Sequence, residues 1–327
     1  MTNVIRIHRH GGPEVLQWEA VDLPDPGPKE VRVRHAAVGL NFIDTYHRSG
    51  SYPMSLPSGI GQEGAGVVEA VGSAVRDLSP GDRVAYPIAP LAPIGGYSEA
   101  RNIRADKLLR LPDTIDFNTG AAMMLQGLTA QYLLRRTYRV QSGDTVLIHA
   151  AAGGVGLIAC QWAKALGATV IGTVGSDEKA ELARAHGCDH AIVYTRENFV
   201  ERVREITGGA GVPVVYDSVG KDTFQGSLEC LRPFGLLAGF GNSSGPVPPF
   251  DIQELSRRGS LFVTRATLFT HLAERATMLA MADELFEVVA SGKVRIEVHQ
   301  TYPLREAARA HADLEGRRTT GSTVLLP

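Results

Sequence analysis

The sequence predicts an α/β protein with two domains, a doubly wound parallel sheet and a second domain rich in β-strands. Three observations predict this fold class. Apolar strand segments alternate with helical segments between residues 146 and 264, which is the pattern of a doubly wound sheet. Short, often alternating apolar runs fill residues 1 to about 125, and further β segments occur after residue 292. The length of 327 residues and the 44% hydrophobic content suit two domains with large cores.

The first domain is expected to be antiparallel and partly barrel-like, because turns such as residues 24–28 and 79–82 interrupt its alternating runs. Its strands are predicted at residues 4–8, 16–19, 31–37, 64–70, 83–85 and 97–102. A helical pattern then begins near Phe117 and continues to Arg136, which joins the two domains.

The end of the chain is expected to return to the first domain. A helix is predicted at residues 272–291, a strand at 294–298, a helix at 304–315 and a strand at 322–326. These strands have no place in a completed six-stranded sheet. We therefore expect residues 1–125 and 267–327 to form one discontinuous β-rich domain, residues 126–266 to form the other, and a ligand-binding cleft to lie between them.

The second domain is organised around a glycine-rich turn. Residues 146–148 are predicted as a buried strand, 150–154 as a tight turn and 155–166 as a helix. Amides at such a helix start attract phosphate, and Gly153, Gly154 and Val155 would offer theirs to a pyrophosphate. The three positions of the Gly-x-Gly-x-x-Gly fingerprint fall on Ala151, Gly153 and Gly156, so the first glycine is missing.

A glycine-rich turn that only packs a helix on a sheet is the alternative, and the downstream part of the chain argues against it. Further strands are predicted at residues 169–174, 190–194, 212–217, 236–241 and 260–264. Between them, one helix is predicted to end at residue 185, and two others are predicted at residues 198–207 and 223–231. Such a succession of strands and helices favours a dinucleotide site.

The end of the second strand indicates which dinucleotide binds. A site for NAD usually has an acidic residue there that holds the ribose 2′-hydroxyl. This chain has Gly175, Ser176 and Lys179, which suit a 2′-phosphate. Asp177 and Glu178 argue the other way, although acids in a first helical turn also have a structural reason to be there. We expect NADPH rather than NADH.

Composition excludes several classes of function. The net charge is −2 and the charged residues are mixed, so neither a nucleic-acid surface nor an anionic-membrane surface is expected. No signal-peptide core and no run of about 18 apolar residues occurs, so a cytoplasmic protein is expected. Cys160, Cys188 and Cys230 stand far apart in the sequence and are expected to be buried free thiols.

Several segments together resemble the zinc-free NADPH:quinone oxidoreductases, the ζ-crystallin-like branch of the medium-chain dehydrogenase/reductase superfamily. They are residues 41–46 (Asn-Phe-Ile-Asp-Thr-Tyr), 61–66 (Gly-Gln-Glu-Gly-Ala-Gly), 127–129, 150–156, 216–220, 240–244 and 319–322. The alanine at position 151 agrees with that branch. The resemblance implies a GroES-like β-rich catalytic domain and a Rossmann domain.

No metal is expected. Zinc dehydrogenases of the superfamily carry a ligand histidine in a Gly-His-Glu motif, whereas this chain has Gln62 there, and an amide is a poor zinc ligand. Residues 1–159 contain no cysteine. The histidines of the first domain (His8, His10, His35 and His47) lack metal-ligand spacing and are interpreted as ordinary surface or core residues.

The resemblance also implies the site residues. Asn41, Tyr46 and Tyr52 would form the catalytic wall near the nicotinamide, with the phenols either stacking on a quinone or supplying a proton; the alternative is packing aromatics. The implied cofactor contacts are Phe42, Ile43, Asp44, Thr45, Tyr46, Thr129, Gly153, Gly154, Val155, Gly175, Ser176, Lys179, Tyr194, Phe240, Gly241, Asn242, Val263 and Arg317. Thr129 could instead bond its own helix, Tyr194 could simply end a strand, and Arg317 could belong to a solvated basic turn.

The expected activity is the NADPH-dependent reduction of a quinone, which is electrophilic enough to accept a hydride without a metal. Two alternatives remain open, a reductase of enones or 2-alkenals and a non-catalytic NADPH-binding protein. Resemblance further implies a homodimer in which the sixth strand pairs with its twin. The physiological quinone, the proton donor and the choice between hydride and single-electron transfer stay open.

Overall fold

The computed structural model describes residues 1–327, which divide into two compact units. Unit 1 comprises Met1–Leu128, Leu272–Ala290 and Ile296–Pro327, and unit 2 comprises Thr129–His271 and Ser291–Arg295. None of the helices is both long enough and apolar enough to span a bilayer.

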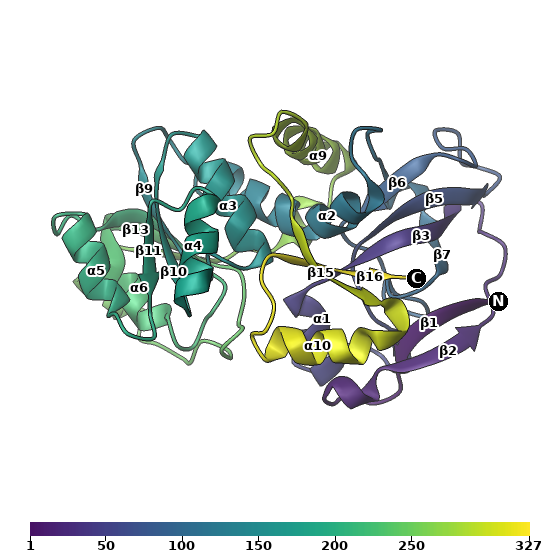
Figure 1. Ribbon diagram of the computed structural model, residues 1–327, viewed down its shortest axis with the longest axis horizontal. Helices are drawn as coiled ribbons and strands as arrows, with labels where there is room; N and C mark the ends of the chain where they lie inside the picture. Colours follow the sequence, from purple (N-terminus) through teal and green to yellow (C-terminus); the bar gives the residue numbers. More distant parts are fainter. The chain divides into compact units, whose positions relative to one another are not determined.

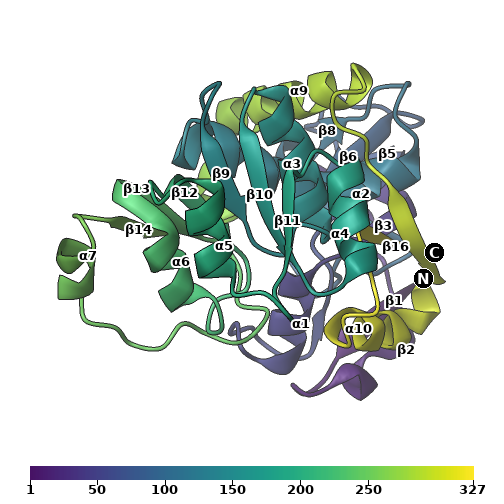
Figure 2. The same ribbon diagram turned by 60° about the vertical axis from the view of Figure 1, so that its left-hand side comes forward.

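Unit 2 is built on a six-stranded parallel sheet with the order β11-β10-β9-β12-β13-β14 (Figure 2). The strands are β9 (Thr145–Ile148), β10 (Thr169–Val174), β11 (His190–Val193), β12 (Val212–Asp217), β13 (Leu231–Gly239) and β14 (Phe262–Arg265). The order reverses between β9 and β12, and such a switch point leaves a crevice for ligands at the carboxyl ends of the strands. The doubly wound sheet expected from the sequence is therefore present.

Strand register explains how one face of this sheet packs. Leu147 on β9 lies opposite Ile171 on β10 and Val215 on β12, and Val215 lies opposite Leu237 on β13. This buried row packs with Val203 of α5 (Phe199–Ile206) and with Phe224 and Leu228 of α6 (Phe224–Cys230) in one apolar cluster. Figure 1 shows α5 and α6 on one side of the strands, and α3 (Gly154–Ala165) and α4 (Asp177–Ala185) on the other.

Unit 1 contains a larger and a smaller β-sheet. The larger sheet has the order β15-β16-β3-β5-β6-β8, with β7 also paired to β3, and the smaller one has the order β2-β1-β4. The strands are β1 (Thr2–Ile7), β2 (Gln17–Val21), β3 (Glu30–Leu40), β4 (Ser58–Gly59), β5 (Gly64–Val71), β6 (Arg83–Tyr86), β7 (Ala100–Arg104), β8 (Leu109–Arg110), β15 (Val298–Pro303) and β16 (Ser322–Leu326). Pairing is antiparallel except between β15 and β16.

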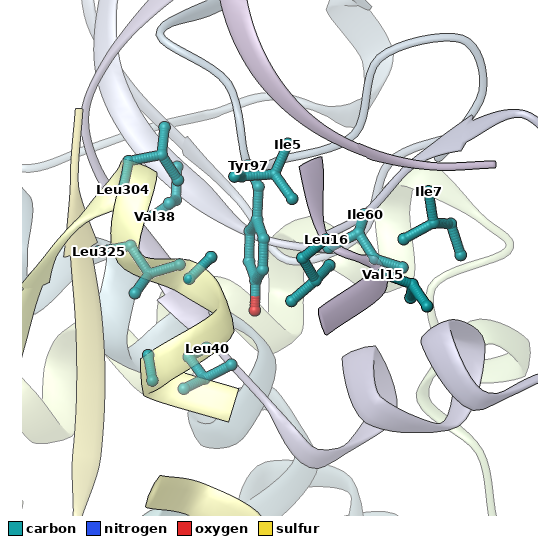
Figure 3. Packing of buried hydrophobic residues seen from close by; sticks show 12 residues of the cluster. Ile5, Ile7, Val15, Leu16, Val38, Leu40, Ile60, Tyr97, Leu304 and Leu325 are labelled. Carbon is teal, nitrogen blue, oxygen red and sulfur yellow. The ribbon is translucent and has the colours of Figure 1, made fainter. Parts of the chain in front are cut away.

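The core of unit 1 joins the beginning and the end of the chain. Tyr97 stands in its centre, with Ile5 of β1, Leu304 and Leu325 of β16 around the ring (Figure 3). The ring is fully buried, and its hydroxyl oxygen lies at the end away from Ile5. Burying the apolar part of a tyrosine while bonding its hydroxyl stabilises a core and also fixes the geometry of the polar partner.

Helices complete unit 1, and one of them was not predicted. They are α1 (Phe42–Ser49), α2 (Phe117–Tyr132, which continues into unit 2), α9 (Arg275–Ala290) and α10 (Ala307–Glu315). Helix α1 begins after Asn41 and ends at Gly50, whose φ of +82° suits glycine. The helix is only eight residues long, and the sequence interpretation overlooked it.

The helix predicted at residues 272–291 is confirmed as α9, whereas the strand predicted at 294–298 was wrong. The long helix begins at Arg275, after the short α8 (Leu268–His271), and the strand predicted at 294–298 begins only at Val298. Arg295 explains the shift of the strand, because its backbone N–H and C=O bond both ends of the Gln161 side chain at 2.9 and 3.0 Å. Those backbone groups are therefore unavailable to a strand ladder.

Candidate active site

The turn before α3 is shaped to receive an anion. Gly153 occupies the N-cap of α3 and no side chain caps the helix, so its first amides are left for a ligand. Ala150 adopts a φ of +54°, and Ala151 donates its N–H to the carbonyl of Thr173 at 3.0 Å. A Cβ at Gly156 would lie 2.3 Å from the carbonyl oxygen of Ala150, so close packing of the turn demands glycine there.

The residues predicted for the adenosine ribose gather at the end of β10. Ser176 caps α4, and its Oγ accepts a hydrogen bond from the backbone N–H of Lys179 at 3.4 Å. A Cβ at Gly175 would lie 2.9 Å from the hydroxyl of Tyr194, so the missing side chain leaves room for that ring. Tyr194 is 43% exposed. The structure thus brings Gly175, Ser176, Lys179 and Tyr194 together within unit 2.

The two acids beside this cluster have structural partners. Arg196 binds both oxygens of Asp177, and this ion pair lowers the pKa of the carboxyl. A hydrogen bond to Ser176 lowers the pKa of Glu178. The carboxylate that most opposed a 2′-phosphate is therefore engaged by a cation, which the sequence alone did not indicate.

A buried polar network lies below the turn. His149 makes ring hydrogen bonds to Thr173 Oγ1 at 2.8 Å and to Ser227 Oγ at 2.9 Å. Ser227 donates to Asp217 at 3.2 Å, so it accepts from His149 Nε2, and Nδ1 accepts from Thr173. Burial lowers the pKa of His149, which agrees with a neutral ring. The network connects the ends of β9, β10 and β12, and the sequence interpretation did not include it.

The loop after β13 packs on the loop after β12. Phe240 donates its N–H to the carbonyl of Asp217 at 2.8 Å, and a Cβ at Gly241 would lie 2.5 Å from the carbonyl oxygen of Ser218. Asn242 lies against Gly220, whose φ is +90°. These residues come directly after the carboxyl ends of their strands, where open α/β sheets bind ligands.

Val263 lies apart from these loops, on the outermost strand of the sheet. It is 36% exposed and lines a groove of about 470 Å³. The neighbouring Phe262 and Arg265 on the same strand and His271 also line this groove.

In unit 1 the three predicted catalytic residues gather around α1. Asn41 precedes the helix, and Tyr46 lies between Phe42 and Tyr52, with ring centroids 6.1 and 5.2 Å away. The backbone N–H of Tyr52 donates to the carbonyl of Tyr46 at 3.0 Å. Both tyrosines are half-buried. Of the other α1 residues, Thr45 donates its hydroxyl to the carbonyl of Phe42 at 2.7 Å.

The side chain of Asn41 sits between buried polar groups. Its Nδ2 donates to Glu63 Oε1 at 2.6 Å, and its Oδ1 accepts from Gln126 Nε2 at 3.1 Å. Burial raises the pKa of Glu63 to about 8. Sequence reasoning missed Glu63 and Gln126, although a carboxylate inside the apolar segment 60–68 was a usable signal.

Asp44 is fully buried at the start of α1. One carboxyl oxygen accepts from the backbone N–H of Asn41 and from the hydroxyl of Tyr97, both at 2.9 Å, while the other has no partner. Burial raises the pKa of Asp44 to about 7. Its side chain therefore holds the helix start in place.

Two further predicted residues lie elsewhere. Thr129 is buried on α2, three residues after Gln126. Arg317 is exposed beyond the end of α10 with a φ of +57°, and its N–H donates to the carbonyl of Leu314 at 3.1 Å.

The residues at the start of α1 do not fit a zinc ion. Asn41 and Gln62 present amides, and both oxygens of Glu63 already accept hydrogen bonds, one of them from the N–H of Leu125 at 2.6 Å. No group of three or more histidine, cysteine and acidic side chains is placed to hold a metal. Zinc sites need such thiolate, imidazole or carboxylate donors.

A GroES-like β unit combined with a doubly wound nucleotide-binding sheet is the architecture of the medium-chain dehydrogenases/reductases. Residues 27–113 match the alcohol dehydrogenase GroES-like domain, and residues 154–284 match the family described as zinc-binding dehydrogenase.

Whole-chain comparisons are more specific. The chain is 58% identical to a quinone oxidoreductase of Pseudomonas aeruginosa and 50% identical to a 2-haloacrylate reductase of Burkholderia, covering 100% and 98% of each chain. The crystal structure of Escherichia coli quinone oxidoreductase complexed with NADPH matches with a TM-score of 0.97 at 51% identity, over 99% of this chain and all of that one. The chain belongs to the quinone oxidoreductase family of the medium-chain dehydrogenases/reductases.

Proposed function

We propose that this protein is an NADPH-dependent quinone reductase that works without a metal. One observation carries the proposal. In a chain 58% identical to a quinone oxidoreductase over its full length, Gln62 stands where the zinc enzymes carry a ligand histidine, and both oxygens of the adjacent Glu63 already accept hydrogen bonds, from Asn41 and Leu125. Such a site lacks the Lewis acid with which a zinc enzyme ionises an alcohol, whereas a quinone accepts a hydride without one.

Unit 2 fits NADPH through two features. The uncapped start of α3 would hold the pyrophosphate with the amides of Gly154 and Val155, beside Gly153, whose own N–H donates to the carbonyl of Ala150 at 2.9 Å. Ser176, Lys179 and Tyr194 would surround the adenosine ribose and its 2′-phosphate, and Arg317 would add a second cation. We assign the remaining contacts with NADPH to Phe240, Gly241, Asn242, Val263 and Thr129.

The chemistry that NADPH supplies when bound is a hydride. The protein's task is then to align the acceptor and to exclude water. Tyr46 and Tyr52 offer the aromatic surface on which a quinone ring would stack, and Asn41 offers an amide beside it. Either phenol could deliver the proton that completes the hydroquinone.

A second candidate is a reductase of activated C=C bonds. It is favoured by the 50% identity to a 2-haloacrylate reductase over 98% of both chains. Both reactions place a conjugated carbonyl compound next to the same hydride donor, so one site could serve either acceptor.

We also propose a homodimer formed through β14. This strand pairs only with β13, which leaves its other edge open. Phe262 is 58% exposed on it, and the groove containing Val263 lies alongside. An open apolar edge strand is a ready pairing surface for a second copy. Light scattering tests this, and a monomeric mass would refute it.

The function is tested by following NADPH oxidation in chelator-treated protein, with a benzoquinone and a 2-alkenal compared side by side. We expect turnover of the quinone and a preference for NADPH over NADH. Turnover of the alkenal alone would select the second candidate. Tight NADPH binding without turnover of either acceptor would indicate a non-catalytic binding protein.

A further inference from the structure

A one-directional chain of hydrogen bonds passes through Asn41. Ser322 Oγ donates to Gln126 Oε1 at 2.7 Å, Gln126 Nε2 donates to Asn41 Oδ1 at 3.1 Å, and Asn41 Nδ2 donates to Glu63 Oε1 at 2.6 Å. Ser322 lies on β16 and Gln126 on α2, while Asn41 directly precedes α1 and Glu63 directly precedes β5. Elements distant in the sequence therefore converge on one amide.

Glu63 is the last acceptor in this series of hydrogen bonds, and its carboxylate sets the direction in which they all run. An ionised carboxylate only accepts hydrogen bonds, and Glu63 accepts one from Asn41 and another from the backbone N–H of Leu125 at 2.6 Å. If the Asn41 amide flipped, its oxygen would face Glu63 Oε1 and its nitrogen would face the N–H groups of Gln126. Both contacts would be repulsive.

Burial makes this preference strong. Glu63 is fully buried, and Asn41, Gln126 and Ser322 are 5%, 7% and 3% exposed. Water cannot readily replace a lost partner at such positions, and leaving a buried polar group unsatisfied is costly. When Glu63 is ionised, Asn41 is consequently held as a donor, with one of its two Nδ2 hydrogens used by Glu63 and the second left over.

We propose that Glu63 and Gln126 are positioning residues that hold Asn41 as a hydrogen-bond donor to the carbonyl oxygen of the electron acceptor. This inference rests on the proposed function and names the acceptor class: conjugated carbonyl compounds, to which quinones, 2-alkenals and acrylates all belong. The acceptor gains a hydride with its electron pair, and then a proton. Between these events its oxygen carries negative charge, which a preoriented amide N–H stabilises.

The proposal implies a dependence on the protonation of Glu63. Burial raises the pKa of Glu63 to about 8, and the charge of Asp44 on α1 raises it further, while hydrogen bonds from Asn41, Leu125 and Met124 oppose the shift. When Glu63 takes up a proton, one of its oxygens becomes a donor and the lock on Asn41 weakens. The acceptor step should therefore become faster as pH rises through the pKa of Glu63.

Other titratable groups face the same carboxyl. Asp44 has its own pKa raised to about 7, Tyr86 on β6 to about 12, and Tyr97 has its pKa raised well above the usual range, all mainly by burial. The two tyrosines stay neutral across the working range. Asp44 and Glu63 both have raised pKa values, so the variant at position 63 is needed to assign the rise of activity with pH to Glu63.

The decisive variant is Glu63→Gln, which keeps the side-chain size but can both donate and accept. Its matched control is Glu69→Gln, the same change on an exposed residue of β5, the strand that directly follows Glu63; Glu69 pairs with Arg34 at the surface. For both variants and the wild type, kcat and KM for a benzoquinone, KM for NADPH, the melting temperature and the pH profile are measured.

For Glu63→Gln we expect kcat with the quinone to fall by about tenfold or more, with KM for NADPH unchanged and the rise of activity with pH abolished. Glu69→Gln should keep the wild-type values and profile. Gln126→Leu should also lower kcat, because it removes the donor to Asn41 Oδ1.

A double-mutant cycle with Asn41→Ala shows whether Glu63 affects kcat by positioning Asn41 or by disturbing the structure in general. If Glu63 acts through Asn41, the Glu63→Gln change should cause little further loss of kcat in the Asn41→Ala background. Independent, multiplying losses would overturn the inference, as would a Glu63→Gln enzyme with wild-type kcat and pH profile. Absence of turnover in the wild type would overturn the proposed function itself, which is a distinct result.

Discussion

Arg48 donates a hydrogen bond from Nη1 to Nδ1 of His311 over 3.0 Å, and both side chains are buried. Because arginine has no acceptor, Nδ1 carries no proton and the Nε2–H faces the hydroxyl of Tyr97 at 3.1 Å. Tyr97 then donates to Asp44 at 2.9 Å. A polar chain therefore runs from α10 to the start of α1, through the centre of the apolar core.

Arg48→Met should destabilise the protein strongly. The change leaves buried His311 without its donor and breaks the 2.7 Å pair between Arg48 and Glu315. We expect the free energy of unfolding in urea to fall by about 2–3 kcal/mol, because Glu315 can reach water but His311 cannot. The exposed Arg309→Met on α10, the helix that carries His311 and Glu315, should change the free energy of unfolding by no more than about 0.5 kcal/mol. Equal effects of the two changes would contradict this account.

Stability should decrease in alkaline solution. The pKa values of Asp44 and Glu63 are raised by burial from 3.8 and 4.5 to about 7 and about 8, so folding favours their protonated forms. This contribution to stability is fully present below the unfolded pKa values and is lost as pH rises through the folded ones.

Two buried histidines give the opposite pH dependence, because they stabilise the fold at neutral pH and lose this contribution in acid. Burial lowers the pKa of His35 from 6.5 to about 4 and that of His311 to about 3, so their contribution is present above pH 6.5 and is lost in acid. Above pH 6.5 the change in the free energy of unfolding with pH therefore comes mainly from Asp44 and Glu63. Urea unfolding should show the free energy of unfolding falling from about pH 6.5 to pH 9, and falling less in Glu63→Gln. An identical slope in that variant would refute the assignment to Glu63.

Arg196→Ala should weaken NADPH binding without touching the cofactor directly. The change frees the carboxylate of Asp177, which directly follows Ser176 and would then repel a 2′-phosphate. We expect the Kd for NADPH to rise by roughly two- to fivefold and the Kd for NADH to change less, since both groups are exposed and screened. Fluorescence titration at low salt measures both. In the double variant Arg196→Ala/Asp177→Asn the loss should disappear.

Ser227→Ala should destabilise the loops of unit 2 that are proposed to bind NADPH. Removing this hydroxyl leaves His149 Nε2 without an acceptor in a buried site, at a cost of about 1–3 kcal/mol. The network connects the strands that carry the α3 turn and Ser176, so we expect a higher Kd for NADPH as well as a lower melting temperature. Val203→Ala, a core change in the same unit, provides a control with similar destabilisation. An increase in Kd as large in that control would contradict a specific role for the network.

Much of unit 2 could be predicted from sequence, because its strands are continuous apolar runs bounded by turns. β10 and β12 begin and end at the predicted residues, and Gly175, Ser176 and Lys179 lie at the end of β10 as expected. Tyr194, which only the resemblance indicated, lies beside Gly175. Local pattern and parallel topology together determine which residues meet at the carboxyl edge.

Other features depend on contacts that no local pattern reports. The ion pair of Asp177 with Arg196 joins residues 19 positions apart, and Asn41 meets Glu63 and Gln126 across 22 and 85 positions. Cys160 and Cys188 also proved to be neighbours, since their thiols share a hydrogen bond that raises the pKa of Cys160. The expectation of buried free thiols was confirmed, but their proximity was not foreseen.

Strand β16 occupies an interior position of its sheet, between β15 and β3, although it consists of residues 322–326. During synthesis on the ribosome, about 280 residues are therefore added between β3 and β16, its neighbour in the sheet. All six strands of unit 2, by contrast, are made within one uninterrupted stretch. Unit 2 should consequently mature first, and the nascent chain must keep the exposed edge of β3 from pairing wrongly until the final strand arrives.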